Sequence, residues 1–189
     1  MEELSTREKL ILAGMDEITS YGLQGFSLRR VAANCGVSCA APYKHFADKQ
    51  ELFSQMVVYV NEKWRERLQG QLRPEGRVED QIADLAVDYV TFLCENPNFR
   101  SILMIKETGL DSPMAAQAAG LSVPVKRLFI ILGRKHRLTR GELRERIFIV
   151  RSLIYGATII LGAGEGAGSP HFESLRESLV SVLKAPAGE

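Results

Sequence analysis

Apolar residues recur at intervals of three and four positions along almost the whole chain, and the alternating runs typical of strands are missing. This spacing places apolar side chains on one face of a helix, so the sequence predicts an all-α protein. We expect helices at about 5–21, 27–35, 38–46, 48–68, 78–95, 98–108, 122–135, 141–162 and 169–183. The segment 109–120 is compatible with a loop or a short helix.

Capping residues indicate where several of these helices begin and end. Gly22 follows the first helix as a left-handed stop. The hydroxyls of Ser27 and Ser38 are placed to cap the second and third helices, which are short. Asp48 with Glu51 three residues later resembles a capping box and predicts the start of the fourth helix.

A segment that contains Gly70, Pro74 and Gly76 interrupts the helical pattern and is the expected domain boundary. It predicts an N-terminal domain, a connecting helix and a larger helical domain. Their expected ranges are 1–49, about 49–69 and 70–189.

Composition is that of a globular protein, with 46% hydrophobic and 25% charged residues. Because 24 basic residues face 23 acidic ones, the net charge indicates no partner. The three cysteines, Cys35, Cys39 and Cys94, form no disulfide framework and suit a reducing compartment. The first residues do not resemble a signal peptide and no apolar run is long enough to cross a membrane, so we expect a soluble cytoplasmic protein.

Residues 27–46 carry the clearest functional signal. Two short capped helices joined by Gly36 and Val37 predict a helix-turn-helix, in which the second helix enters the DNA major groove. Charge is locally positive, as phosphate binding requires. Between positions 22 and 49 the chain has one acid, Asp48, against His45 and the cations Arg29, Arg30, Lys44 and Lys49.

The stretch from Arg7 to Phe53 resembles the DNA-binding domain of TetR/AcrR transcriptional regulators. The matching residues are Leu10, Ala13, Gly22, Ser27, Leu28, Arg29, Val31, Ala32, Gly36, Val37, Ser38, Tyr43, Lys44, His45, Phe46, Lys49, Glu51 and Leu52. The resemblance implies a cytoplasmic homodimer that binds a near-palindromic operator. It also implies a larger helical domain that binds a small-molecule effector and supplies the dimer interface, as in a repressor that the effector releases.

The resemblance also implies roles for individual residues. Tyr43, His45 and Lys49 match positions that hold DNA phosphates in the family. Ser27 matches a cap that contacts phosphate, and Arg29 a position that often reaches DNA. Base recognition is expected from the start of the third helix, which is formed here by Ser38, Cys39, Ala40 and Ala41, with Lys44 on its exposed side.

The sequence departs from the common family pattern in two ways. Pro42 stands where leucine is usual, and it removes a backbone donor, so the third helix either starts late or tightens into a 3₁₀ turn. Cys39, Ala40 and Ala41 are unable to make the bidentate contacts that distinguish guanine and adenine. We therefore expect recognition through Lys44, Arg29, thymine methyl contacts and DNA shape.

Two other functions are compatible with parts of the sequence. Cys39 at a helix N-terminus favours a reactive thiol, which would give a regulator that responds to thiol oxidation. A helical interaction module without DNA binding is the second alternative. Cys35, Cys39 and His45 have no fourth ligand nearby, so we expect no metal. No catalytic arrangement occurs in the sequence, and we expect neither an enzyme nor a cofactor.

A second basic cluster lies near position 140. Because Glu142 and Glu145 are interleaved with it, we interpret it as a solvated surface, with an acidic ligand or nucleic acid as the alternative. Its members are Arg134, Lys135, His136, Arg137, Arg140, Arg144 and Arg146.

The C-terminal half is rich in aromatic residues and is expected to hold a partly apolar effector. The candidate pocket residues are Tyr89, Phe92, Met104, Phe129 and Tyr155. The last two helices are expected to form a four-helix dimer interface, unless their apolar faces only close the domain's own core. Those faces consist of Leu143, Ile147, Val150, Ile154, Ala157, Ile160, Leu161, Leu175, Leu179, Val182 and Leu183.

Overall fold

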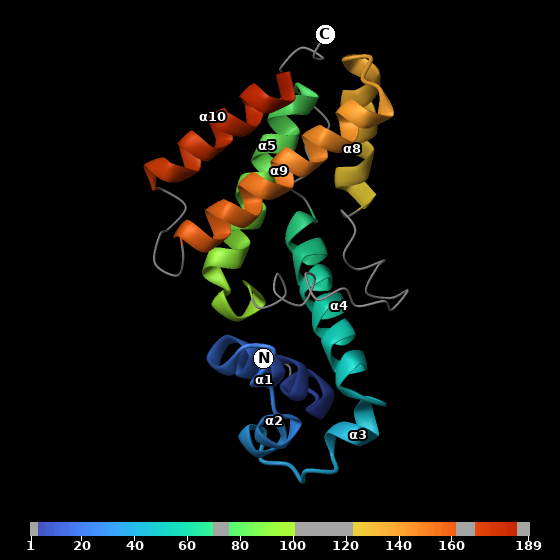
Figure 1. Ribbon diagram of the computed structural model, residues 1–189, viewed down its shortest axis with the longest axis vertical. Helices are drawn as coiled ribbons and strands as arrows, with labels where there is room; N and C mark the ends of the chain where they lie inside the picture. The colour runs from blue at the N-terminus through green and yellow to red at the C-terminus, as the bar shows by residue number, and fades with distance from the viewer. Residues whose placement is uncertain (1–3, 70–75, 101–122, 162–168, 185–189) are drawn as a thin grey trace. The chain divides into compact units, whose positions relative to one another are not determined.

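The computed structural model describes residues 4–69, 76–100, 123–161 and 169–184, and within them all regular structure is helical (Figure 1), which confirms the all-α prediction. The elements are α1 (Thr6–Tyr21), α2 (Leu28–Asn34), α3 (Pro42–His45), α4 (Lys49–Leu68), α5 (Val78–Glu95), the 3₁₀ helix η1 (Pro97–Arg100), α8 (Val123–Lys135), α9 (Arg140–Leu161) and α10 (Pro170–Lys184). Residues 101–122, which include most of the helix expected at 98–108 and all of the segment 109–120, lie outside the described residues. No helix of the described part is long and apolar enough to span a membrane.

The described residues divide into two compact units. The first comprises 4–63 with 98–100, and the second comprises 64–69, 76–97, 123–161 and 169–184. The division falls within α4, between Lys63 and Trp64.

In the first unit, α1 packs against α2 and approaches α4 at Gly14. Ser5 and Glu8 form a capping box that starts α1, and the Gly22 N–H bonds to the Ile18 carbonyl at 2.8 Å where the helix ends. Gly14 faces Met56, whose terminal methyl would overlap a Cβ at that position. Glycine therefore allows the two helices to approach. The core of this unit includes Leu10, Ile11, Met15, Ile18, Val31, Ala32, Phe46, Leu52, Phe53 and Met56.

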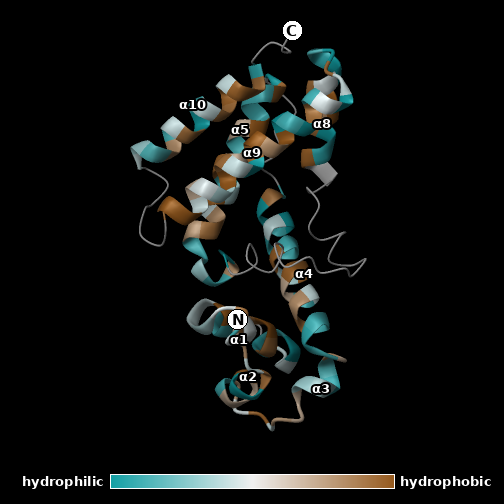
Figure 2. Ribbon diagram, viewed as in Figure 1, coloured by the Kyte–Doolittle hydropathy of each residue, from teal (hydrophilic) through white to brown (hydrophobic). Residues whose placement is uncertain are grey.

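The second unit is organised around α5, which packs against α8, α9 and α10. Along these helices hydrophobic residues alternate with hydrophilic ones at helical intervals (Figure 2), and one hydrophobic set is buried between the helices. The buried set includes Ile82, Ala86, Val90, Leu93, Leu128, Phe129, Leu132, Val150, Ile154, Leu161, Phe172, Leu175, Leu179 and Leu183. Arg146 is also buried, and its guanidinium donates to the Leu183 carbonyl at 2.7 Å near the C-terminus of α10.

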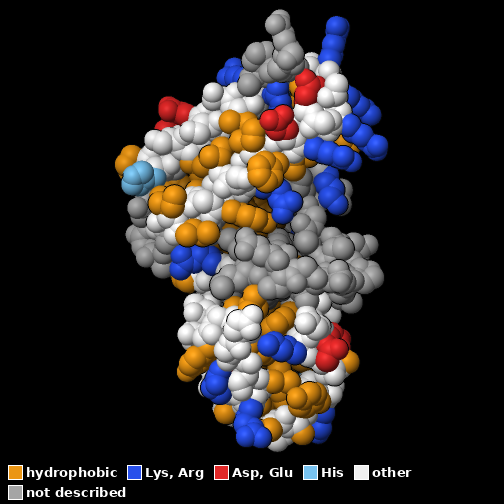
Figure 3. All heavy atoms as spheres, in the orientation of Figure 1, with side chains coloured by type: hydrophobic (Ala, Val, Ile, Leu, Met, Phe, Trp, Pro, Cys, Tyr) orange, Lys and Arg blue, Asp and Glu red, His pale blue; other side chains and the backbone are white. Residues whose placement is uncertain are grey.

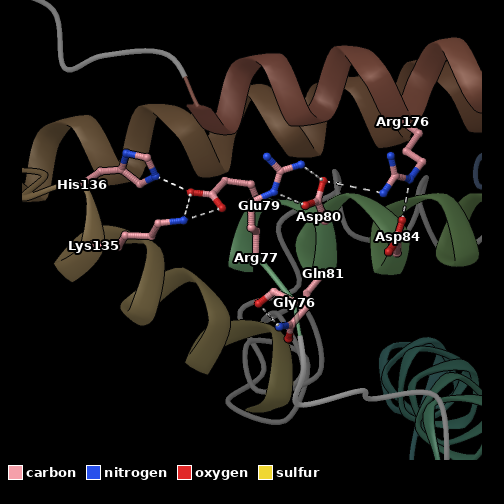
Figure 4. Close-up of polar contacts among 9 residues, drawn as sticks. All are labelled: Gly76, Arg77, Glu79, Asp80, Gln81, Asp84, Lys135, His136 and Arg176. Atoms are coloured by element: carbon pink, nitrogen blue, oxygen red, sulfur yellow. Dashed lines mark hydrogen bonds and ion pairs between the residues drawn. The ribbon is translucent and has the colours of Figure 1, made fainter.

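Polar contacts tie α5 to its neighbours at one end of this unit (Figure 4). The buried carboxylate of Glu79 accepts from Lys135 Nζ at 2.8 Å on both oxygens and lies 2.5 Å from His136 Nε2. Burial alone would raise the pKa of Glu79, but the hydrogen bonds from Lys135 and His136 outweigh it and lower the pKa to about 2. On the next turn of α5, Arg176 donates to Asp84 at 2.6 Å.

Candidate nucleic-acid interface

The start of α2 is fixed by a cap, as the sequence predicts. Ser27 has an extended backbone, and its hydroxyl accepts from the Arg30 N–H at 3.5 Å. The Ser27 N–H in turn donates to Glu17 Oε1 at 3.1 Å. The first turn of α2 is therefore held against α1, with Arg29 exposed at its surface.

Arg30 is part of this attachment. Its guanidinium contacts the buried Glu17 carboxylate through Nε at 2.7 Å, donates to the Gly25 carbonyl at 2.5 Å and lies 4.2 Å from the centre of the Tyr21 ring. Arg30 counts as one of the cations of the positive footprint in the sequence, but the structure pairs it with Glu17, 13 residues away. Its charge is therefore compensated within the domain.

The turn between α2 and α3 has the expected glycine reversal, but α3 begins later than the Ser38 cap predicts. Gly36 has a φ of 68°, as a left-handed reversal requires. Ser38 is not a helix cap, because α3 begins only at Pro42 with Ala41 as the preceding residue. The Ala41 N–H instead bonds to the Ser38 carbonyl in a turn, at 2.9 Å. A proline at the first helical position loses no hydrogen bond, which explains the late start.

Three polar side chains of α3 are presented to solvent. Tyr43 is 63% exposed, and Lys44 and His45 are exposed beside it, whereas Phe46 is buried directly after the helix. Ahead of the helix, Ser38, Cys39 and Ala40 are exposed in the turn and Ala41 is half-buried. In the space-filling view, Lys and Arg side chains lie at the end of the unit where α2 and α3 are found (Figure 3).

Lys49 takes a different position from the other candidate cations. It is half-buried, with its ammonium 5.0 Å from the Phe26 ring centre, 5.2 Å from that of Phe53 and 3.4 Å from the Leu23 carbonyl. These contacts attach the first residue of α4 to the domain core. Lys49 therefore contributes to packing as well as to local charge.

The cap at the start of α4 follows the sequence prediction closely. The Glu51 N–H donates to Asp48 Oδ1 at 2.8 Å. The Glu51 carboxylate accepts a hydrogen bond from the Ala47 N–H at 2.6 Å, whereas in a standard capping box it would accept from the N–H of Asp48, one residue later.

The cysteines do not gather. Cys35 is half-buried, and burial raises the pKa of its thiol. Cys39 is exposed in the turn, three positions before α3 begins, so the helix N-terminus that was expected to activate its thiol is absent. Among the described residues, no three histidine, cysteine or acidic side chains are placed to bind a metal.

The candidate effector residues fall into separate groups. Tyr89 and Phe92 stack, with ring centres 6.3 Å apart, and both contact Trp64 of α4, at 4.9 and 5.5 Å. Burial raises the pKa of Tyr89. Tyr155 accepts from Arg151 at 3.2 Å, Phe129 is buried on α8, and Met104 lies outside the described residues.

From the sequence, Trp64 is expected only in the hydrophobic core, and Arg67 is not among the candidate effector residues. Both lie in the part of α4 that belongs to the second unit. The Arg67 guanidinium lies 5.9 Å from the Phe92 ring centre and donates to Glu95 at 2.6 Å, while its Nε is buried without a hydrogen-bond partner. The spacing of Trp64 and Arg67, three residues apart on one helix, was the available signal.

Most of the apolar stripe that was expected to join two subunits is buried within one subunit, so that part of the prediction was wrong. The buried members are Val150, Ile154, Leu161, Leu175, Leu179 and Leu183. They pack with α5, because α5 contacts both α9 and α10. Of the predicted stripe, Ile160 is exposed.

Residues 10–56 match the family model described as bacterial regulatory proteins, tetR family. The nucleoid occlusion factor SlmA of Haemophilus influenzae is 25% identical over 99 residues, which are 50% of this chain and 45% of the relative. The chain spans about half the length of this and other curated relatives that it matches.

Two solved structures share the fold over nearly the whole chain. The fatty acid degradation regulator FadR from Bacillus halodurans has a TM-score of 0.74 at 13% identity, covering 97% of this chain and 96% of its own. FadR from Bacillus subtilis in complex with stearoyl-CoA has a TM-score of 0.73 at 12% identity, covering 96% and 99%. The segment 10–56, which contains the helix-turn-helix, is thus similar to bacterial regulatory proteins of the tetR family. The chain as a whole shares its fold with the two FadR structures.

Proposed function

We propose that the protein is a transcriptional regulator, most simply a repressor, that binds a near-palindromic operator as a homodimer in the cytoplasm and is released by a small molecule. The observation that carries this proposal is the exposed polar face of α3, formed by Tyr43, Lys44 and His45, within a domain that matches the tetR model. Because these three side chains are exposed, they are not needed for packing and are available to bind DNA.

In this proposal, Tyr43, His45 and Lys49 contact phosphates and Ser27 binds one at the start of α2. Base edges are met by Lys44 and Arg29. The turn that precedes α3 offers only small side chains, Ser38, Cys39, Ala40 and Ala41, which suit thymine methyls better than guanine or adenine edges.

The effector is proposed to be partly apolar and to bind in the second unit. The aromatic group of Trp64, Tyr89 and Phe92, with Arg67 and its unpartnered Nε at the edge, provides apolar surface and one free donor. Tyr155, Phe129 and Met104 remain further candidates. That a protein of similar fold was solved with stearoyl-CoA favours an effector with a long apolar part.

The homodimer is proposed to form through the last two helices, but by another face of α9 than the sequence suggested. Phe148 and Ile159 are 71% and 74% exposed, and they share one side of the helix with Tyr155. Ile160, which is 81% exposed, lies next to this side, together with Gly156, which has open space where a side chain would be. Large apolar residues in such a stripe mark an association surface.

Effector binding is proposed to act through α4, because this helix begins in the first unit and ends in the second. Its residue Trp64 contacts the aromatic rings of the second unit. The effector would favour a conformation in which the two α3 helices no longer match half-sites about 34 Å apart. A coupling of about 1–3 kcal/mol would lower operator affinity about 5–150-fold.

Selection of binding sites from random-sequence DNA tests the proposal without knowledge of the target gene. We expect the selected sequences to converge on two inverted half-sites with a fixed spacing. The double variant Tyr43→Ala, Lys44→Ala should select none. The variant Arg65→Ala serves as a matched control, since Arg65 is an exposed cation of the second unit. Failure of the wild-type protein to enrich any sequence would contradict DNA binding.

A further inference from the structure

The outward face of α8 and the corner that joins it to α9 form a surface that the proposed regulator does not use. Ile130 and Ile131 are 51% and 43% exposed at the middle of α8. Exposed cations lie on both sides of them along the chain. These cations are Lys126, Arg127, Arg134, Arg137, Arg140 and Arg144, and with the two isoleucines they make up what is called here the cationic face. In Figure 3, Lys and Arg side chains gather over α8.

The acids interleaved with this sequence do not neutralise the cationic face. Glu142 turns back to accept from the Thr139 N–H and hydroxyl, both at 2.6 Å, and so caps α9. Glu79, which is buried, is paired with Lys135. Of the interleaved acids only Glu145 is left exposed. Within the described ranges, no ion pair involves any of the six cations of the face.

The cationic face is also fixed in shape. The opposite side of α8 is buried through Leu128, Phe129 and Leu132. Arg137 adopts a φ of 53° and the Leu138 N–H bonds to the Gly133 carbonyl at 2.9 Å, which ends α8 and turns the chain toward α9. Positions 126, 130 and 134 are four apart and therefore share one side of the helix. A partner would meet a preformed surface.

We propose that the cationic face docks an acidic segment of another protein that carries apolar side chains among its carboxylates. The isoleucines would be covered by the apolar side chains, and the surrounding arginines would each pair with a carboxylate. An apolar centre with arginines around it is the usual anatomy of a protein interface. A nucleic acid backbone fits less well, because phosphates offer nothing to cover Ile130 and Ile131. The six unpaired cations supply the charge complementarity that selects an acidic partner.

The probe for the test is a labelled synthetic peptide of about four helical turns, with leucines on one face and glutamates elsewhere. A peptide of the same composition in scrambled order is the control, because it keeps the charge and loses the apolar face. Binding to the full-length protein is followed by fluorescence anisotropy. The variants are Ile130→Ser with Ile131→Ser, and Arg127→Glu with Arg134→Glu. The control variant is Arg65→Glu, at an exposed cation outside the cationic face.

We expect the patterned peptide to bind at least about tenfold more tightly than the scrambled one, a difference of about 1.4 kcal/mol. Each double variant should weaken the patterned peptide about tenfold or more, with unchanged thermal unfolding, and Arg65→Glu should not. Equal binding of the two peptides, or indifference to the isoleucine pair, would overturn the proposal.

A second experiment, with DNA as the ligand, distinguishes binding by the cationic face from binding by the helix-turn-helix. In a Tyr43→Ala, Lys44→Ala background, non-specific duplex DNA should bind no more weakly when Arg127 and Arg134 are reversed in charge. A clear loss would assign the cationic face to nucleic acid and overturn the protein partner. The result does not depend on whether the wild-type protein has an operator, so the two proposals fail separately.

Discussion

The guanidinium of Arg30 lies against the buried carboxylate of Glu17, and this contact joins α2 to α1. Glu17 Oε1 also accepts the Ser27 N–H, so a single oxygen receives the side chain of one α2 residue and the backbone of its cap. The other oxygen, Oε2, is buried without a hydrogen-bond partner. Arg29, the neighbour of Arg30, is exposed and takes no part in this contact.

Neighbouring arginines should therefore respond in opposite ways to replacement. Arg30→Ala leaves the buried Glu17 carboxylate without its charged partner and should lower the free energy of unfolding clearly more than Arg29→Ala does. Arg29→Ala should change it by less than about 0.5 kcal/mol but weaken DNA binding. Urea denaturation and DNA anisotropy on both variants provide the comparison. If Arg29→Ala destabilised the protein as much as Arg30→Ala, the division of roles would be wrong.

Acid should weaken the second unit through Glu79. Its pKa is lowered to about 2 in the folded protein, so the unfolded chain binds a proton at higher pH than the folded chain does. The stabilisation is thus complete above the unfolded pKa of about 4.3 and is lost as the pH falls toward 2. Glu79→Gln should cost about 1–3 kcal/mol at pH 7 and flatten the dependence on pH below 5. Urea midpoints measured at pH 7 and 3.5 would show it, and an unchanged acid response in Glu79→Gln would contradict this role.

The exposed stripe of α9 makes a prediction about assembly. Ile159→Glu should convert a dimer into a monomer at micromolar concentration, because a carboxylate would be buried without a partner in the interface. Ile130→Glu, at an exposed isoleucine of α8, should remain dimeric. Light scattering distinguishes the two, and a wild-type monomer would dismiss this interface.

Lys49 should be a less specific probe of DNA binding than Lys44. Lys49→Ala removes two cation–π contacts and should reduce stability by about 1 kcal/mol as well as DNA affinity. Lys44→Ala should reduce DNA affinity alone, since Lys44 is exposed. Thermal unfolding alongside anisotropy separates the effects. A Lys49→Ala protein as stable as the wild type would mean that its packing contacts contribute little.

Local signals explain which parts of the fold were predictable. The bounds of α5 are those expected from periodicity. The caps at Ser27 and Asp48 are local, because each side chain bonds to a backbone N–H three residues later. Non-local packing explains the failures. The face of α9 that carries Ile154 is buried because α5 packs against α9, a contact between distant segments. Arg30 is likewise held by Glu17, a residue of another helix. Ser38 failed as a cap because Pro42 is favoured at a first helical position, a local rule that outweighed the serine signal.

The most direct test of the central claim is the salt dependence of DNA binding by the full-length protein, measured by anisotropy on a duplex from the site selection. Affinity should fall steeply with salt for the wild type. The slope of log K against log salt should decrease by about 0.9 for Lys49→Ala, which removes the lysine proposed to contact a phosphate, and change little for Arg30→Ala. A salt-insensitive complex, or one whose slope Lys49→Ala leaves unchanged, would contradict a phosphate-anchored helix-turn-helix in this protein.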